Sequence, residues 1–185
     1  MVLARESVAK AYVHGTMLDV GCGDGTLDLI WRKRVEYAVG LDIYLPALKK
    51  AKRYYDDVVQ CDIRFLPVKL KSFDSVISIS VLEHLLQNEA VKLLYEIEEV
   101  ARDTIVISTQ HYFHPKTHER SPHKCFIPIN IFRRKGYIVR GVESRYLERN
   151  IVGKIFAVIS FQPMLAFLGH DIVAYKISEK ASEND

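Results

Sequence analysis

The chain has 185 residues, of which 49% are hydrophobic and 26% charged, and its formal net charge is +3. This composition is typical of a globular protein with its own hydrophobic core, and it excludes collagen-like, intrinsically disordered and disulfide-stapled miniprotein classes. The three cysteines are odd in number and widely spaced, so we expect no disulfide framework, a single domain over residues 1–185 and a cytoplasmic location.

From residue 17 onward, short β-branched runs alternate with segments of helical periodicity. The expected strands are 17–21, 37–42, 57–61, 73–80, 104–109, 137–143 and 171–177. The expected helices are 25–34, 45–54, 88–101 and 128–135. Strands and helices that alternate in this way form right-handed βαβ units around a parallel sheet. The sequence therefore predicts an α/β, Rossmann-like, doubly wound fold with a mostly parallel seven-stranded sheet and an antiparallel last strand.

The remaining segments of the chain carry no strong signal for export or for a membrane. The first ten residues include Arg5, Glu6 and Lys10 and lack an apolar run, so no signal peptide is expected. The apolar stretch 151–168 is interrupted by polar residues and is shorter than the roughly 20 residues that span a bilayer. We expect this stretch to cover the site or to form a homodimer face, and residues 178–185 to form a disordered tail.

The sequence LDVGCGDGT over residues 18–26 places glycines at alternate positions after the first expected strand. The loop glycines are Gly21, Gly23 and Gly25. Glycine permits a positive φ and lets a ligand approach the backbone closely. A dinucleotide fingerprint would need its third glycine at Thr26. The acidic residues around the loop are Asp19, Asp24 and Asp28. They disfavour a pyrophosphate, so a cationic ligand fits the loop better.

Two carboxylates follow the next expected strands. Asp42 ends the second strand, and Asp62 follows the third. The ends of parallel strands meet at one edge of a sheet, so both residues should converge with the glycine loop on one ligand, and Asp42 stands at the spacing of a carboxylate that accepts hydrogen bonds from ribose hydroxyls. A helix N-cap explains either aspartate alone equally well. Their occurrence together favours a nucleoside ligand.

These motifs resemble those of the class I S-adenosylmethionine-dependent methyltransferases, in the type 11 group with the pattern L-D-V-G-C-G-x-G. The resemblance covers about residues 15–110, and its motifs lie at 18–25, 40–43, 61–67 and 73–85. It implies that the chain binds S-adenosyl-L-methionine as its cofactor and transfers a methyl group from it to an acceptor. A non-catalytic module that binds the same cofactor within a complex is the alternative, and an aminopropyl transferase is disfavoured because no paired acids follow the fourth strand.

The resemblance also implies roles for individual residues in binding this cofactor. The glycine loop would contact the methionine and adenosine portions, and Asp19 would hold the loop. Asp42 would accept hydrogen bonds from the ribose hydroxyls, and Asp62 would accept one from the adenine amine. Three isoleucines would complete the site, two enclosing the adenine and one offering backbone contacts near the sulfonium, namely Ile43, Ile63 and Ile79.

Transfer of a methyl group from a sulfonium depends on alignment, but a hydroxyl or ammonium acceptor also needs a base. His84 and His111 follow the fourth and fifth expected strands and are candidate catalytic bases. His84 has an alternative role in packing or loop pinning, because Glu83-His84 recurs in the resembled group irrespective of substrate.

Residues 111–154 carry 10 basic and 3 acidic residues and four of the seven histidines. We interpret this segment as the binding site of an acceptor with phosphate or carboxylate groups, although a solvated basic face is the alternative. A small molecule is favoured over RNA, because the fourth strand end lacks the sequence of base-amine methyltransferases. The candidate acceptor-binding residues are Tyr112, Lys116, Arg120 and Lys124.

The same segment contains residue types that bind zinc: His111, His114, His118, His123 and Cys125. Their spacing matches no paired metal-binding motif, and Pro115 and Pro122 prevent a shared helix face. The sequence therefore favours an acceptor-binding loop and no metal ion.

Overall fold

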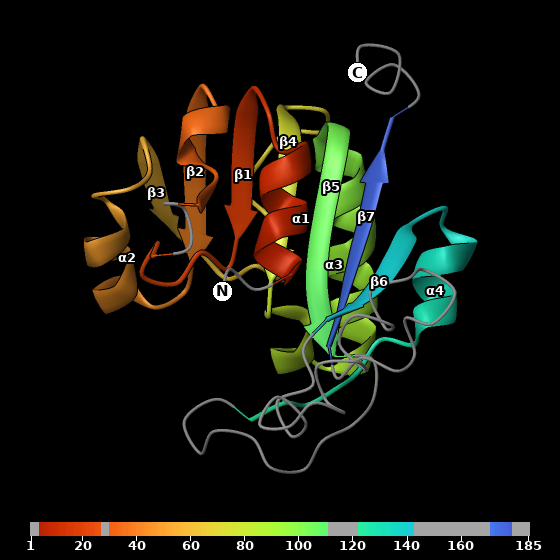
Figure 1. Cartoon of the computed structure of the whole chain (residues 1–185). Coiled ribbons are helices and arrows are strands. Elements are labelled where there is room, and N and C mark those ends of the chain that lie inside the picture. The colour runs from red at the N-terminus through yellow and green to blue at the C-terminus, as the bar shows by residue number, and fades with distance from the viewer. Residues whose placement is uncertain (1–3, 27–29, 111–121, 143–170, 179–185) are drawn as a thin grey trace, which may run out of the picture.

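The computed structural model describes residues 4–26, 30–110, 122–142 and 171–178. Its strands are β1 (Thr16–Val20), β2 (Tyr37–Asp42), β3 (Asp57–Gln60), β4 (Phe73–Ile79), β5 (Ala101–Gln110), β6 (Ile138–Val142) and β7 (Asp171–Ile177). They form one sheet in the order β3-β2-β1-β4-β5-β7-β6 (Figure 1). β1 to β5 pair in parallel, and β7 pairs antiparallel to both β5 and β6. The predicted fold, including the antiparallel last strand, is confirmed.

Successive residues of the central strands face opposite sides of the sheet and build two separate cores. In β1, Leu18 packs into one core and Met17 into the other. Likewise, Val76 and Ile77 of β4 belong to different cores. All four side chains are fully buried. The apolar runs that mark these strands in the sequence are therefore explained by a sheet that is covered on both faces.

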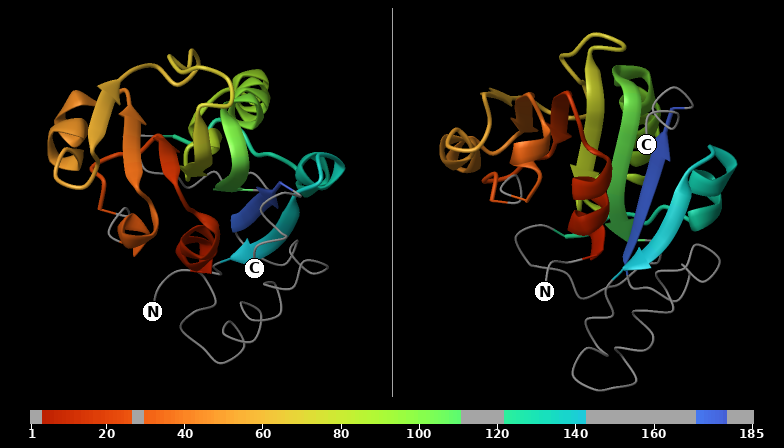
Figure 2. Two further views of the ribbon diagram at one scale, coloured as in Figure 1. Left: turned by 90° about the horizontal axis from the view of Figure 1, so that it is seen from above. Right: turned by 45° about the horizontal axis from the view of Figure 1, so that its top comes forward.

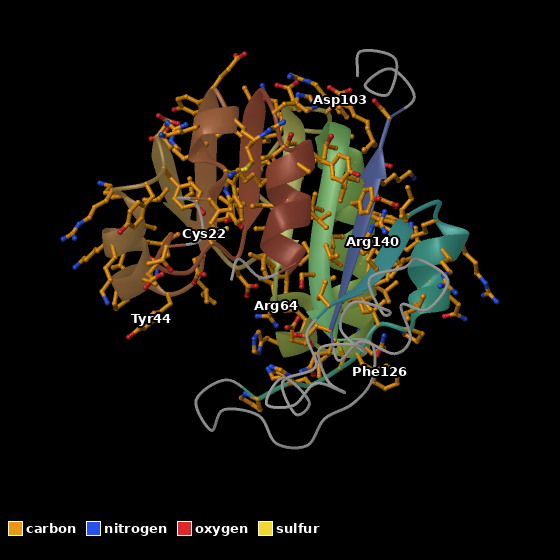
Figure 3. The ribbon with its side chains drawn as sticks, in the orientation of Figure 1. Cys22, Tyr44, Arg64, Asp103, Phe126 and Arg140 are labelled. Atoms are coloured by element: carbon orange, nitrogen blue, oxygen red, sulfur yellow. The ribbon has the colours of Figure 1, made fainter. Side chains whose placement is uncertain are left out.

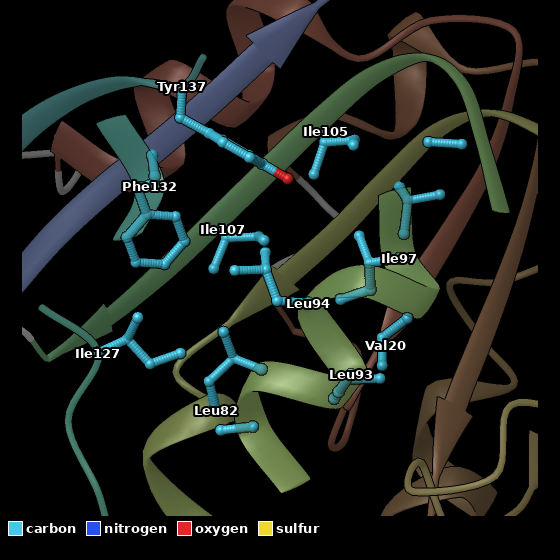
Figure 4. Packing of buried hydrophobic residues seen from close by; sticks show 14 of the residues in the cluster. Val20, Leu82, Leu93, Leu94, Ile97, Ile105, Ile107, Ile127, Phe132 and Tyr137 are labelled. Atoms are coloured by element: carbon cyan, nitrogen blue, oxygen red, sulfur yellow. The ribbon is translucent and has the colours of Figure 1, made fainter. Parts of the chain in front are cut away.

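The first core lies beneath α3 (Gln87–Val100) and α4 (Ile129–Arg134), as Figure 4 shows. The buried residues of α3 are spaced three or four apart, which gives the helix one apolar face. These residues are Ala90, Leu93, Leu94, Ile97 and Val100. Phe132 of α4 is fully buried and meets the ring of Tyr137 edge to face, with 5.6 Å between the ring centroids.

The opposite face of the sheet is covered in part by α1 (Ala4–Tyr12), which the sequence analysis missed. Figure 2 shows α1 and α3 on opposite sides of the sheet. α1 lies against β5 and β7, and the ring of Tyr12 stacks on that of Tyr175 with 4.6 Å between centroids. α2 (Leu45–Ala51) lies at the other end of the sheet, against β2 and β3.

Two expected segments differ from the structure or lie outside it. In place of a helix over 25–34, the described residues form turns and a short 3-10 helix, Arg32–Arg34, while Trp31 is fully buried. The apolar stretch 151–168 and residues 179–185 of the expected tail lie outside the described residues. No helix in the described part of the chain is long and apolar enough to cross a membrane.

Candidate functional site

The glycine loop, residues 21–25, leaves the end of β1 and folds over the end of β2. The backbone N–H groups of Gly21 and Cys22 both donate to the carbonyl of Leu41, at 2.8 and 2.9 Å. The three loop glycines have φ values of +84°, +57° and +79° in chain order, a region that side-chain-bearing residues rarely adopt. These values agree with the sequence expectation that glycine permits a positive φ at this strand end.

The three glycines differ in what surrounds them. A Cβ atom at Gly21 would collide with the side chain of Val81, and one at Gly25 would lie 2.9 Å from Tyr54 Cδ2. At Gly23, no heavy atom lies within 4 Å of the Cβ position. Gly21 and Gly25 are therefore required by packing, whereas the open space at Gly23 lets a ligand approach the backbone.

Asp42 joins the ends of β1 and β2. Its Oδ2 atom accepts a hydrogen bond from the Gly23 N–H at 2.9 Å, and its Oδ1 accepts one from the Tyr44 N–H at 2.8 Å. Each carboxylate oxygen has a further lone pair, so both can accept additional hydrogen bonds from a ligand. Asp42 therefore orders the glycine loop and can still accept hydrogen bonds from a ligand beside Gly23.

Asp19 lies below the loop and is only 4% exposed. The Tyr55 hydroxyl donates to its Oδ2 atom at 2.5 Å. Burial, together with the nearby charges of Asp19 and Asp42, raises the pKa of the Cys22 thiol far above its ordinary value. Cys22 therefore stays protonated at neutral pH, and a thiolate nucleophile in the loop is not available.

Asp62 follows β3 and is held by Arg64. The Arg64 side chain donates from Nε to both carboxylate oxygens, at 3.0 and 2.9 Å, and from Nη2 to Oδ2 at 2.5 Å. These hydrogen bonds lower the pKa of Asp62 and keep it ionised. Arg64 also reaches Glu89 at the start of α3, at 3.1 Å. The sequence analysis missed this network, which occupies part of the acceptor capacity of Asp62.

The three isoleucines assigned to the site are not equally exposed. Ile43 is 63% exposed, Ile63 is half-buried and packs against the first core, and Ile79 is buried at the end of β4. Figure 3 shows Tyr44, next to Ile43, and Arg64 toward the edge of the sheet at which β1 and β4 end. Ile43 and Ile63 therefore belong to the segments that follow β2 and β3, as the sequence analysis predicts.

The chain turns sharply after β4. Ser80 has a φ of +57°, and its N–H donates to the carbonyl of Ser108 at 2.9 Å. A left-handed conformation costs a side-chain-bearing residue roughly 1–2 kcal/mol. This strained turn is typical of functional positions, and it places Val81 against Gly21 of the glycine loop.

Beyond this turn, Glu83 is almost fully buried, at 3% exposed. Its Oε2 atom accepts a hydrogen bond from the Thr109 hydroxyl at 2.9 Å, and its backbone carbonyl accepts one from the Lys124 N–H at 2.7 Å. The residues after β5 are thereby tied to the short 3-10 helix η3 (Leu82–His84) that follows β4.

His84 and His123 meet next to Glu83. Their ring centroids lie 4.9 Å apart in an edge-to-face arrangement, and the possible ligand atoms of Glu83, His84 and His123 all lie within 4.8 Å of one another. Burial lowers the pKa of His84 below its ordinary value of 6.5, against the opposing effect of its hydrogen bond with the Pro122 backbone. His84 is therefore a neutral imidazole at pH 7, able to accept a proton or to bind a metal ion.

The structure describes only part of the predicted acceptor side. His111, Tyr112, Lys116 and Arg120 lie outside the described residues, whereas Lys124 is described and exposed. The sequence analysis missed the role of Glu83 and the contact of His84 with His123, which join distant parts of the chain. An acidic residue within the apolar sequence VLEHLL was the one available signal for a buried carboxylate.

A family model described as a methyltransferase domain matches residues 18–106. An uncharacterised protein of Methanocaldococcus jannaschii is 37% identical over 105 residues, which cover 55% of this chain and 39% of that protein. An uncharacterised methyltransferase of Mycobacterium bovis is 33% identical over 73 residues, which cover 37% of each chain. The matches thus span about two fifths of the length of these relatives.

Solved structures share the fold at low sequence identity. The complex of the Haloferax volcanii Trm112 methyltransferase activator with its proposed methyltransferase gives a TM-score of 0.67 at 16% identity, covering 94% of this chain and 87% of that chain. The small RNA methyltransferase HEN1 gives a TM-score of 0.68 at 14% identity, with 95% and 25% covered. The complex of DhpI with SAH gives 0.63 at 13% identity, with 94% and 82% covered.

Proposed function

We propose that the chain is a class I S-adenosylmethionine-dependent methyltransferase, which transfers a methyl group from S-adenosyl-L-methionine to an acceptor. The observation that carries the proposal is the hydrogen bond between Asp42 and the Gly23 N–H, beside the open space at Gly23. This hydrogen bond lies at the end of β1, where β2 and β3 continue the sheet on one side and β4 and β5 on the other. Open α/β sheets bind their ligands at such a reversal of strand order.

The residues present fit this cofactor. The open Gly23 backbone would pass close to it, and Asp42 would accept hydrogen bonds from the ribose hydroxyls. Asp62, kept ionised by Arg64, would accept one from the adenine amine. The apolar contacts to the adenine would come from Ile43 and Ile63, and the backbone of Ile79 would lie near the sulfonium. Asp19 would act indirectly, by fixing Tyr55 beneath the loop.

The bound cofactor supplies a methyl group on a positively charged sulfur, so the protein needs no covalent intermediate of its own. Its task is to align the acceptor with this methyl group, and alignment alone can contribute about 7–11 kcal/mol to lowering a barrier. We propose His84 and His111 as the candidate bases. His84, which is neutral at pH 7, could take a proton from a hydroxyl or ammonium acceptor.

The acceptor side is proposed from the basic segment 111–154, where an anionic small molecule remains favoured over RNA. The proposed contacts are Tyr112, Lys116, Arg120 and Lys124. Lys124 is exposed and is anchored through its backbone N–H to Glu83, so its side chain would extend toward solvent or an anionic ligand. If Arg120→Ala and Lys124→Ala leave the KM for the acceptor unchanged, this assignment is wrong.

Calorimetric titration with S-adenosylhomocysteine tests the binding site. Asp42→Ala should weaken binding by about tenfold to a hundredfold, because hydrogen bonds to a charged group contribute roughly 1.5–3 kcal/mol. Asp57→Ala is the matched control. Asp57 is an exposed carboxylate at the amino-terminal end of β3, whereas the proposed site lies at the carboxyl ends of the strands. Equal affinities in all three proteins would contradict the ribose assignment.

A non-catalytic module would bind the same ligand without turnover, so turnover separates the two functions. Incubation with S-adenosyl-L-methionine and a pool of candidate acceptors should yield S-adenosylhomocysteine, detected by mass spectrometry. The methyltransferase-domain match favours catalysis over a binding role alone. Binding without S-adenosylhomocysteine formation from any acceptor pool would favour the binding module.

A further inference from the structure

Three side chains of types that can bind a metal ion, from two distant segments of the chain, meet beyond the ends of β4 and β5. Glu83 and His84 belong to η3, and His123 follows β5 along the chain. Their possible ligand atoms all lie within 4.8 Å of one another. In a tetrahedral site with metal–ligand bonds of about 2.0–2.2 Å, ligand atoms lie about 3.4 Å apart. Side-chain adjustments of about 1 Å would therefore bring the three groups around one ion.

Each of the three side chains is oriented by a hydrogen bond to a neighbouring residue. His123 Nδ1 lies 2.7 Å from Gln110 Oε1, and because an amide oxygen only accepts, Nδ1 is the donor and Nε2 carries the lone pair. His84 likewise bonds the Pro122 backbone, which offers only a carbonyl, so one ring nitrogen donates and the other is basic. Ligands of bound metal ions are typically held by such outer hydrogen bonds, which fix the tautomer and the ring orientation.

The carboxylate is oriented in the same way. Thr109 donates to Oε2 of Glu83, and the side chain is 3% exposed. A buried carboxylate beside two imidazole rings offers oxygen and nitrogen ligand atoms, which are donor types that divalent transition-metal ions accept. Since the Lys124 and Cys125 N–H groups both donate to the Glu83 carbonyl, the backbone also keeps His123 beside η3.

We propose that Glu83, His84 and His123 bind a divalent transition-metal ion, such as Zn²⁺, at the acceptor side of the cofactor site. Three protein ligands leave at least one coordination position open, as in catalytic zinc sites and unlike closed structural sites. Val81, two residues before Glu83, packs against Gly21, so the segment that carries Glu83 and His84 begins at the glycine loop. This set of ligands differs from the histidine run considered in the sequence analysis, because only His123 is common to both.

One consequence rests on the proposed function. An acceptor hydroxyl in the open position would lose its proton to solvent more readily, because a bound cation lowers the pKa of a coordinated oxygen. That oxygen then forms the bond to the methyl carbon while the carbon–sulfur bond breaks and its electron pair stays on sulfur. His84 would be a ligand in this arrangement and could not act as the base. The acceptor class would be an oxygen nucleophile.

Titration with Co²⁺, followed by visible d–d absorption, tests the site without any turnover. The wild-type chain should bind one ion with the spectrum of a four- or five-coordinate site, and Zn²⁺ should displace it. Glu83→Gln and His123→Ala should each raise the Kd at least tenfold. Gln110→Ala, which keeps all three ligands, should raise it about 10–100-fold through loss of the outer hydrogen bond. His14→Ala is the control and should bind as the wild type does, because His14 precedes β1 and lies at the amino-terminal ends of β1 and β4, away from the proposed ligands.

Binding of S-adenosylhomocysteine by each variant, measured in the same samples, shows that the fold is intact and keeps this test separate from the proposed function. Retention of cofactor binding with loss of Co²⁺ binding supports the site. No d–d absorption in the wild type would overturn the proposal. Equal Co²⁺ binding by the wild type, Glu83→Gln and His123→Ala would also overturn it, because the ion would then be held elsewhere.

Discussion

Two glycines of the chain form a matched pair that separates backbone strain from ligand contact. Gly23 has a φ of +57° and no heavy atom within 4 Å of its Cβ position; Gly136, between α4 and β6, has a φ of +83° and its nearest neighbour, Lys176 Cε, at 3.9 Å. Alanine therefore fits sterically at both positions in the ligand-free structure. The left-handed backbone should cost each variant roughly 1–2 kcal/mol.

For a chain of this size, each kcal/mol of destabilisation lowers the Tm by roughly 2–4 °C. Gly23→Ala and Gly136→Ala should therefore both melt about 2–8 °C below the wild type in differential scanning calorimetry. The two variants should differ in their affinity for S-adenosylhomocysteine. A methyl group at Gly23 would fill the space that the ligand needs, and we expect its affinity to fall at least tenfold, about 1.4 kcal/mol.

The affinity should be measured by calorimetric titration well below the Tm of both variants, so that neither is partly unfolded. Gly136→Ala should bind as the wild type does. If Gly23→Ala also binds with wild-type affinity, the ligand does not approach the backbone at Gly23, and the assignment of the glycine loop to cofactor binding is wrong. If both variants lose affinity equally, the loss reflects the whole fold, and the argument from open space at Gly23 fails.

Three further predictions concern stability. Burial raises the pKa of Asp74, but hydrogen bonds from Thr16 and Arg102 outweigh it and lower the value from 3.8 to about 2. Ionised Asp74 thus stabilises the fold above about pH 4, and this contribution is lost as the pH falls toward 2. Urea unfolding should show Asp74→Asn less stable than the wild type at pH 7 and the difference shrinking in acid; a pH-independent difference would contradict this. Tyr55→Phe removes the hydroxyl that donates to buried Asp19 and should cost about 1.5–3 kcal/mol in urea unfolding, with Tyr54→Phe as the control and no loss as the contrary result. Leu94→Ala, at a fully buried position of α3, should cost about 2–5 kcal/mol, and a loss below about 1 kcal/mol would show that the core can close around the gap.

The order of the elements is visible in the sequence because the central strands are buried on both faces. The run Val76-Ile77 contributes to both cores, and such continuous apolar runs identify parallel strands. α1 was missed because its contacts with β5 and β7 come from residues far along the chain, which local periodicity does not reveal. The predicted helix over 25–34 failed in its described part for a related reason, since Trp31, which directly precedes the 3-10 helix Arg32–Arg34, is buried in the second core.

The candidate cofactor site is predictable because each of its parts is local in sequence. The glycine loop and Asp42 are each recognised at a strand end, and the parallel topology brings them together. The cluster of Glu83 with His123 depends instead on how the chain returns after β5, which spacing does not determine. The pairing of Asp62 with Arg64 was also missed, because a carboxylate two residues before an arginine has no fixed geometry outside a folded turn.

The most direct test of the cofactor assignment is a crystal structure of the chain with S-adenosylhomocysteine. We predict that the ligand lies over the Gly23 backbone, that its ribose hydroxyls donate to the carboxylate of Asp42, and that its adenine lies between Ile43 and Ile63. A ligand bound at any other edge of the sheet, with Asp42 contacting only Gly23 and Tyr44, would contradict the proposed function.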